Sequence, residues 1–500
     1  MTHANDSLSW GDALFLYLER QGMPLNIASV HIFEGDIPLA DCREYVRSKI
    51  PLLPRYGQRL TTPPLNLGLP CWENDPTFDV HNHLHEVMLK RGTDAEVKAA
   101  AGKVLSNTLD RNRPLWDLTF LHGVKGNCTA MVTRVHHCLA DGIAGVGLMN
   151  LLMDATPIVH RSRKKISRAP EPRRDPATML LDWSMNSYFS TVQRLLKMQA
   201  EVLELVHKIV LNREEWPVND FQEFLPELVA PTEPLPFNMI CNGPQKIAWA
   251  EAPMEDIEAI KHALGATVND VALGLVTSVL RRYVELRGVS TRKRLLRIMV
   301  PVNVRPNGDS HVGNRISLVP VTIPLDIRSP KKLIAAIHQR TSFIKHAHIA
   351  EFVGLAGSLL GAIPTAVQAV AGPIASALPI TPFNLVCTNV PGPQVPLYFM
   401  GHKMLRWYPY VPIGGDMAMN CAILTYNGTA HFGFNGDVHA APDLARLEQF
   451  FKLSLAELRQ AAGLKSPRQK TRKPSKKKAS PITPEPTKAG PEKVLAAVAS

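Results

Sequence analysis

Apolar and polar residues alternate along several short runs in the first third of the chain, and this two-residue period predicts β-strands. The strands expected there are residues 28–35, 116–124 and 128–137, and the last two are expected to form a hairpin with Lys-Gly-Asn, residues 125–127, as its turn. Apolar residues at helical spacing predict helices at residues 39–50 and 93–110. Thr93 is the expected N-cap of the second helix, and Glu96 would complete a capping box. With a further helix expected from about Gly142, residues 1–160 are interpreted as one mixed α/β half.

The second part of the chain also contains both the two-residue period of strands and the spacing of helices. Apolar stripes predict helices at residues 254–265, 267–288 and 443–463. Apolar and alternating runs predict strands at residues 294–306, 316–327, 383–393, 417–428 and 429–437. We therefore expect residues 245–463 to form a second α/β half, similar in size to the first.

The segment between the halves, residues 161–244, has a different composition. Residues 160–176 carry seven Lys or Arg and three Pro, which is typical of a linker. A long helix is expected next, at about residues 177–211. Its broad apolar face fits packing between domains or contact with a bilayer surface.

Residues 352–380 contain no charged residue. Their length alone permits a transmembrane helix, but Pro364, Pro373 and several glycines argue against one straight span. We expect instead a buried or surface-embedded pair of helices, as in a lipid-handling protein.

The composition is that of a chain with a sizeable core, since 45% of the residues are hydrophobic and 20% are charged. The formal net charge of +12 is uneven, because residues 465–500 hold ten Lys or Arg against two acidic residues. Residues 464–500 are therefore expected to form a disordered basic tail. Seven scattered cysteines without a C-x-x-C pair argue against a disulfide framework or a zinc knuckle. No secretory signal pattern is present at the N-terminus, and a cytoplasmic protein is expected.

The run TRVHHCLADGIAGVG, residues 133–147, carries the clearest candidate chemistry. A strand sends the adjacent His136 and His137 to opposite faces, which argues against a shared metal site. An imidazole with a pKa of about 6.5 can take a proton from a hydroxyl at neutral pH, so His137 is a candidate general base. Asp141 is placed to cap the following helix. From these residues alone, a loop histidine followed by a cap explains the run equally well.

A second group of histidines is His81, His83 and His85, which share one face if residues 78–87 form a strand. Such a group could ligate zinc. A solvated or core-edge strand is the interpretation that we favour.

Residues 136–142 match the H-H-x-x-x-D-G motif of CoA-dependent acyltransferases, and further runs along the chain narrow the resemblance. These runs are LSWGDALFLYLE (8–19), RPLWDLTFL (113–121), ATVNDVALGLV (266–276), VPVNVRP (300–306), GNRISLVPVTIP (313–324) and TNVPGP (388–393). In this order they resemble the bacterial wax ester synthase/diacylglycerol acyltransferase family, over about residues 7–462.

The resemblance implies a mixed α/β fold of two chloramphenicol-acetyltransferase-like halves, each a mixed sheet flanked by helices, with a tunnel between them. It implies that His137 is the general base and that His136 supports it. Asp141 would be structural and pair with an arginine, and Gly142 would allow a tight turn of the backbone.

The resemblance also implies substrate-binding residues. Those expected near the active centre are Pro114, Leu115, Trp116, Asn269 and Asp270. Those expected to shape the channel between the halves are Gly313, Asn314 and Asn389. Core packing and helix capping explain the first group equally well from the residues alone, so this alternative stays open.

The activity implied is transfer of a fatty acyl group from acyl-CoA to the hydroxyl of diacylglycerol or of a long-chain alcohol, with acyl-CoA as substrate and with no cofactor or metal. The alternatives are a condensation-type or polyketide-associated acyltransferase with a carrier-bound donor, and a noncatalytic lipid-binding relative. The expected partner is a membrane or lipid-droplet surface, with the protein peripherally associated with the inner face of the membrane or with lipid inclusions. Nucleic acid is not expected, because no recognition motif or aromatic–basic platform is found.

Overall fold

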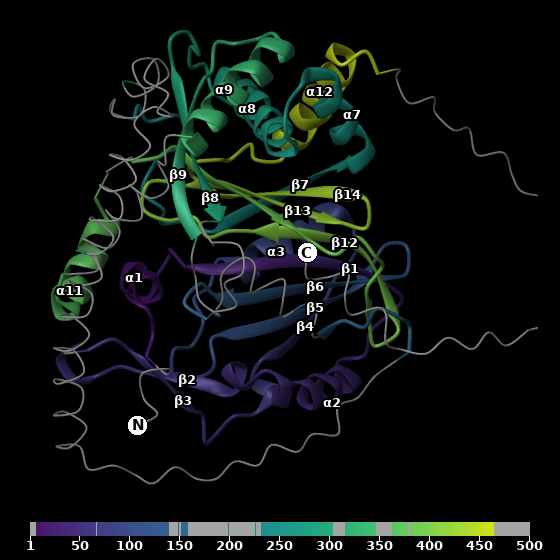
Figure 1. Ribbon diagram of the computed structural model, residues 1–500. Helices are drawn as coiled ribbons and strands as arrows, with labels where there is room; N and C mark the ends of the chain where they lie inside the picture. The colour runs from purple at the N-terminus through teal and green to yellow at the C-terminus, as the bar shows by residue number, and fades with distance from the viewer. Residues whose placement is uncertain are drawn as a thin grey trace, which may run out of the picture. The chain divides into compact units, whose positions relative to one another are not determined.

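The structure is a computed structural model of the 500-residue chain (Figure 1). Apart from isolated positions, it describes residues 7–66, 68–139, 152–158, 232–303, 316–346, 363–378 and 382–464. The described residues belong to one unit of the fold, Met1–Leu464. The helix expected from Gly142, nearly all of the segment at 160–231 and the basic tail lie outside the described residues.

A six-stranded mixed sheet carries the first half, in the order β11-β12-β1-β6-β5-β4. Its strands are β1 (Asn26–Glu34), β4 (Leu84–Met88), β5 (Trp116–Val124), β6 (Cys128–His136), β11 (Tyr398–Phe399) and β12 (His402–Tyr410). The expected hairpin of β5 and β6 is confirmed, with Gly126 and Asn127 in the left-handed region at φ 87° and 54°. The helices of this half are α1 (Trp10–Leu18), α2 (Leu39–Lys49) and α3 (Asp94–Leu105). A separate two-stranded sheet pairs β2 (Gln58–Thr61) with β3 (Cys71–Asn74).

The strand β12 comes from the second half of the chain but lies inside the first sheet. It pairs antiparallel with β1, with Ala28 opposite Tyr410. The sequence pattern does not predict this strand, because HKMLRWYPY has no regular alternation of apolar and polar residues and contains Pro409, a residue that lacks the N–H donor of a ladder. The two halves thus share a strand, and the boundaries expected for them stay a prediction.

A second six-stranded mixed sheet has the order β7-β14-β13-β10-β8-β9. Its strands are β7 (Gln245–Pro253), β8 (Leu295–Asn303), β9 (Ile316–Pro324), β10 (Leu385–Pro391), β13 (Met419–Tyr426) and β14 (Thr429–Asp437). One side is covered by a group of helices (Figure 1), namely α7 (Met254–Leu264), α8 (Val268–Leu286), α9 (Pro330–His346) and α12 (Arg446–Ala461). The expectation of a mixed α/β fold with two sheet-containing halves is therefore confirmed.

The helix α8 runs through the core of this second half, and most of its residues are buried. Among the described residues no single helix is long and apolar enough to cross a bilayer. In the described part of the chain, the pair α7 and α8 together meets the length and composition that this requires, but the pair is bent by 101°.

The start of α3 shows the limit of a prediction from local sequence patterns. The Thr93 hydroxyl accepts the N–H of Glu96 at the start of α3, as expected. The Glu96 carboxylate, however, accepts the N–H groups of Lys90, Arg91 and Gly92 rather than that of Thr93. Gly92 has a φ of 60°, and its left-handed turn directs these three N–H groups to one place. The second part of the expected capping box is therefore wrong.

The helix α11 (Thr365–Ser376) occupies part of the uncharged stretch at 352–380, of which residues 352–362 lie outside the described residues. It begins directly after Pro364 and packs on α1, where a Cβ on Gly372 would lie 2.9 Å from the backbone oxygen of Tyr17. Its opposite side exposes Val367, Val370 and Ile374, at 53%, 68% and 60%.

The histidines at 81, 83 and 85 do not share one strand face. A 3₁₀ turn (Val80–Asn82), capped by Asp79, precedes β4, and the pairing of β4 with β5 starts only at Leu84. His81 is exposed beside Asp79, whereas His83 is buried against Trp116. The expected strand over 78–87 is thus wrong at its start.

Candidate active site

The turn after β6 positions the paired histidines. His136 is the last residue of β6, so His137 already lies in the turn and not on the strand as expected. The N–H of His136 donates to the Leu115 carbonyl and that of His137 to the Leu25 carbonyl, each at 3.0 Å. Two neighbouring segments therefore hold the backbone of this turn. His136 is fully buried, whereas His137 is half-buried.

The ring of His137 lies against α1. It stacks on the ring of Phe15, with centroids 3.7 Å apart and an angle of 8° between the planes. Burial lowers the pKa of His137 to about 4; a positive charge on the neighbouring His136 ring would act in the same direction, and a hydrogen bond with its own backbone opposes the shift. The imidazole is therefore neutral at pH 7 and able to accept a proton.

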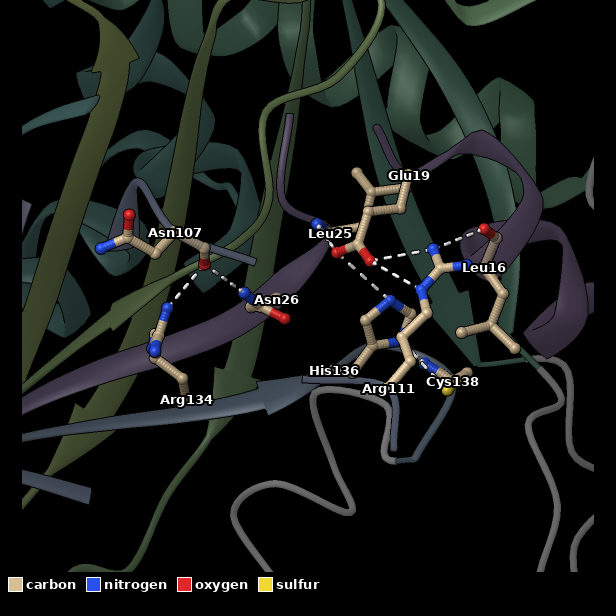
Figure 2. A network of polar contacts seen from close by, with 9 residues as sticks. All are labelled: Leu16, Glu19, Leu25, Asn26, Asn107, Arg111, Arg134, His136 and Cys138. Atoms are coloured by element: carbon tan, nitrogen blue, oxygen red, sulfur yellow. Dashed lines mark hydrogen bonds and ion pairs between the residues drawn. The ribbon is translucent and has the colours of Figure 1, made fainter. Parts of the chain in front are cut away.

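The ring of His136 makes different contacts (Figure 2). Its Nδ1 accepts the backbone N–H of Cys138 at 3.2 Å and lies 3.0 Å from the Cys138 sulfur. Its Nε2 lies 3.4 Å from Oε1 of Glu19, an ion-pair distance. Because Nδ1 accepts a hydrogen bond, the ring proton of neutral His136 sits on Nε2, facing the carboxylate.

Glu19 joins this turn to two further segments (Figure 2). Its Oε1 accepts the N–H of Leu25 at 3.0 Å, and its Oε2 accepts Nη2 and Nε of Arg111 at 2.9 and 3.3 Å. Burial by itself would raise the pKa of Glu19, but His136, the Leu25 N–H and Arg111 outweigh it and lower that pKa to about 2. Glu19 is thus an ionised carboxylate inside the protein.

The segment at residues 114–116 lies behind the histidine turn. The buried Leu115 supplies the carbonyl that accepts the N–H of His136. Trp116 is buried, donates its Nε1–H to the Tyr56 carbonyl at 2.8 Å and stacks on His83. Pro114 is buried beside them. These contacts pack the segment in the core and hold the backbone of His136. A substrate-binding role for the segment stays a prediction.

Asp270 makes the contacts of a structural residue. It is fully buried, completes a capping box with Thr267 at the start of α8, and accepts hydrogen bonds from His338 Nδ1 at 2.8 Å and the Thr341 hydroxyl at 2.7 Å, both on α9. Asn269 beside it is half-buried. Among the described residues, no hydrogen bond or ring contact joins either residue to the histidine turn.

The remaining expected site residues are only partly placed. Asn389 lies half-buried on β10, opposite Ile423 of β13. Four others lie outside the described residues, namely Asp141, Gly142, Gly313 and Asn314. The tunnel expected between the halves stays a prediction. In the described part of the chain, no group of three or more His, Cys, Asp or Glu is arranged to hold a metal ion.

Three residues of this site are absent from the sequence-based candidates: Phe15, Glu19 and Arg111. Phe15 and Glu19 lie on the run LSWGDALFLYLE, which contributes to the family resemblance but reads as an ordinary apolar helix. The only local signal is a carboxylate directly at the end of that apolar run. Arg111 lies in a charged turn that has no pattern of its own.

Comparisons with known proteins agree with this arrangement. The model of the wax ester synthase/diacylglycerol acyltransferase catalytic domain matches residues 8–272, and that of the family's C-terminal domain matches residues 312–459. A probable diacylglycerol O-acyltransferase of Mycobacterium tuberculosis (strain ATCC 25618 / H37Rv) is 28% identical over 463 residues, which cover 89% of this chain and 94% of the relative. A putative one of Mycobacterium tuberculosis (strain CDC 1551 / Oshkosh) is 29% identical over 466 residues, covering 91% and 99%.

Solved structures show the same fold. The wax ester synthase/diacylglycerol acyltransferase from Marinobacter aquaeolei VT8 superposes with a TM-score of 0.65 at 23% identity, covering 92% of this chain and 100% of that one. The first condensation domain of the calcium-dependent antibiotic synthetase superposes with a TM-score of 0.54 at 15% identity, covering 91% and 97%. The catalytic-domain match spans more than half of the chain and includes the histidine turn. The chain therefore belongs to the wax ester synthase/diacylglycerol acyltransferase family and is an acyltransferase of that family.

Proposed function

We propose that this chain transfers a fatty acyl group from acyl-CoA to the hydroxyl of diacylglycerol or of a long-chain alcohol, with His137 as the general base. The observation that carries the proposal is the position of His137, at a turn whose backbone is fixed by Leu25 and Leu115 and with its ring stacked on Phe15. Burial there lowers the pKa of the imidazole to about 4, which favours its neutral form at pH 7. The names of the curated relatives support diacylglycerol as an acceptor, and the name of the family supports an alcohol.

The chemistry needs one base and no acyl-enzyme. The neutral His137 ring takes the proton of the acceptor hydroxyl while the hydroxyl oxygen attacks the thioester carbonyl carbon. The tetrahedral intermediate collapses with cleavage of the carbon–sulfur bond. The CoA sulfur leaves and takes the proton back from the imidazolium, so that the products are the ester and free CoA. A thioester is already activated, so no serine nucleophile is required.

The proposal includes a lipid surface, at which the protein binds its acceptor. Diacylglycerol and long alcohols partition into lipid, and the outward side of α11 carries the exposed Val367, Val370 and Ile374. The same helix packs on α1, whose Phe15 stacks on His137. The helices α11 and α1 therefore connect this apolar face to the proposed base. A location at the inner face of the membrane or at lipid inclusions follows as part of the proposal.

The experiment is an acceptor assay with the purified chain, radiolabelled palmitoyl-CoA and, in separate reactions, diolein or hexadecanol. We expect labelled triacylglycerol, labelled wax ester or both, formed in proportion to the CoA released. CoA release without a product that depends on the acceptor would contradict the proposal. Product formation only from a carrier-bound acyl donor would favour the condensation-type alternative.

A further inference from the structure

The carboxylate of Glu19 is surrounded by donors, and none of its described partners is an acceptor. Oε1 accepts the Leu25 N–H and faces Nε2 of His136, while Oε2 accepts Arg111 (Figure 2). The side chain is only 3% exposed. A buried carboxylate is costly unless it is fully paired, so this arrangement depends on its partners remaining donors.

The donor on the His136 side defines the tautomer of that ring. The backbone N–H of Cys138 occupies Nδ1, so that nitrogen carries no proton in the neutral ring. The proton of the neutral ring is then on Nε2, which lies 3.4 Å from Oε1 of Glu19, an ion-pair distance without the geometry of a hydrogen bond. The Cys138 N–H disfavours a proton on Nδ1, and the nearby Glu19 carboxylate favours one on Nε2, so both contacts favour the same tautomer.

The donor at Leu25 connects Glu19 to the proposed base. The N–H of Leu25 donates to Glu19, and the carbonyl of the same residue accepts the N–H of His137 at 3.0 Å. Glu19 is also the C-cap of α1, where its N–H bonds the carbonyl of Phe15, the residue stacked on His137. Glu19 is thus joined to three residues that contact or adjoin His137: to Leu25 and His136 through its carboxylate, and to Phe15 through its backbone N–H.

Arg111 secures the carboxylate from the opposite side. Its Nη2 donates both to Glu19 and to the Leu16 carbonyl near the end of α1, at 2.9 and 2.8 Å. The guanidinium side chain is 47% exposed, whereas the carboxylate that it binds is buried. Arg111 therefore neutralises the charge of Glu19 without being buried itself, and it ties that charge to the helix that carries Phe15.

We propose that Glu19 is a positioning residue for acyl transfer: its carboxylate holds His136 in the Nε2–H tautomer and holds Leu25 in place, and these two contacts set the position of the His137 imidazole. The proposal rests on the proposed function for its catalytic consequence. Its structural part, the tautomer of His136, is independent of any turnover.

The test exchanges the carboxylate for an amide of the same shape. An amide has one acceptor and one donor end, so Glu19→Gln cannot face Arg111 on one side and Leu25 with His136 on the other without opposing two donors. Histidines labelled with ¹⁵N report the tautomer, and His136→Gln identifies the signal of His136. We expect His136 to lose its pure Nε2–H state in Glu19→Gln. We also expect kcat to fall by about 10- to 100-fold, with KM for palmitoyl-CoA within about twofold.

A second variant keeps the test decisive if Glu19→Gln fails to fold. In Glu19→Gln/Arg111→Met the competing donor is gone, so the amide oxygen can turn to Leu25 and His136. We expect this variant to fold, to recover the Nε2–H tautomer and to regain at least several-fold of kcat. Glu73→Gln is the matched control, since it removes the carboxylate of an ion pair with Arg59 on the separate β2–β3 sheet. It should leave both readouts unchanged.

Three outcomes would overturn the proposal. These are an unchanged His136 tautomer in Glu19→Gln, an altered tautomer with kcat within twofold of the wild type, and no recovery in the double variant. A wild-type chain that transfers no acyl group to any acceptor contradicts the proposed function instead, because the ¹⁵N readout of Glu19 does not need turnover.

Discussion

The imidazole of His137 stacks face to face on the phenyl ring of Phe15, with centroids 3.7 Å apart and planes inclined by 8°. Phe15 belongs to the first helix of the chain and His137 to the turn after β6, so the contact exists only in the folded protein. It covers one face of the imidazole and fixes the plane of the ring. The orientation of the proposed base is therefore set by a helix remote in sequence from the motif that carries it.

Replacing Phe15 tests this orientation. Phe15→Leu keeps an apolar side chain but removes the stacked ring, a contact worth about 0.5–1.5 kcal/mol. If the contact holds the reactive orientation, kcat should fall by about two- to tenfold with little change in KM. Phe15→Tyr keeps the ring and should retain kcat. Steady-state kinetics of the two variants decide the matter, and a Leu variant as fast as the wild type would show that the stack has no catalytic role.

The pH profile should reflect the low pKa of His137. A general base acts when unprotonated, so activity is lost as the pH falls through the pKa that burial sets at about 4. We expect kcat/KM to stay level from pH 8 down to about pH 5 and to decline below that. Circular dichroism at each pH separates this decline from unfolding. An acid limb with its midpoint near about 6.5 would mean that His137 titrates as an exposed histidine does.

Asp270 gives a direct choice between capping and substrate binding. Asp270→Ala removes the cap of α8 and leaves His338 and Thr341 of α9 without their acceptor, so we expect about 2 kcal/mol or more of lost stability in urea unfolding. KM for palmitoyl-CoA should remain within about twofold. Asn269→Ala, at the adjacent position, should change neither quantity. Unchanged stability with a tenfold higher KM in Asp270→Ala would assign the residue to the substrate instead.

The exposed face of α11 should contribute to lipid binding. Val370→Ser/Ile374→Ser removes two of its exposed apolar side chains, and we expect severalfold weaker flotation with phosphatidylcholine–diolein vesicles. Met88→Ser is the control, since Met88 is 73% exposed on a different element, the edge strand β4 of the first sheet. Equal flotation of wild type and double variant would rule out this face.

The basic tail makes a separate, electrostatic prediction. Deletion of residues 465–500 should weaken binding to anionic vesicles at low salt and leave turnover in detergent largely intact. Vesicle binding that is unchanged at low salt would remove the tail from the interaction.

Local patterns predicted most of the regular elements of this fold. The hairpin of β5 and β6 could be predicted, because the alternation of its strands and the Lys-Gly-Asn turn are both local features of the sequence. The pairing of β12 with β1 could not be predicted, because strand order is a tertiary property and Pro409 weakens the local strand pattern. Glu96 shows the same limit on a small scale, since the turn at Gly92 redirects its carboxylate.

The residues of the site likewise fall into those that the sequence predicts and those that only the fold brings together. His137 could be proposed from its motif because the residue type and its neighbours are contiguous in sequence. Glu19 and Arg111 are polar residues at the ends of unrelated segments, and only folding brings them to His136. Asp270 could be identified as a cap from the Thr-x-x-Asp spacing, but its bonds to α9 could not.

The central claim is that the imidazole of His137 takes the acceptor proton. The most direct measurement is the rate of acceptor-dependent ester formation by His137→Ala, with thermal unfolding of the same preparation as the control for folding. The account predicts a loss of at least about 100-fold in kcat with a transition close to that of the wild type. Ester formation within about twofold of the wild-type rate by a folded His137→Ala protein would contradict it.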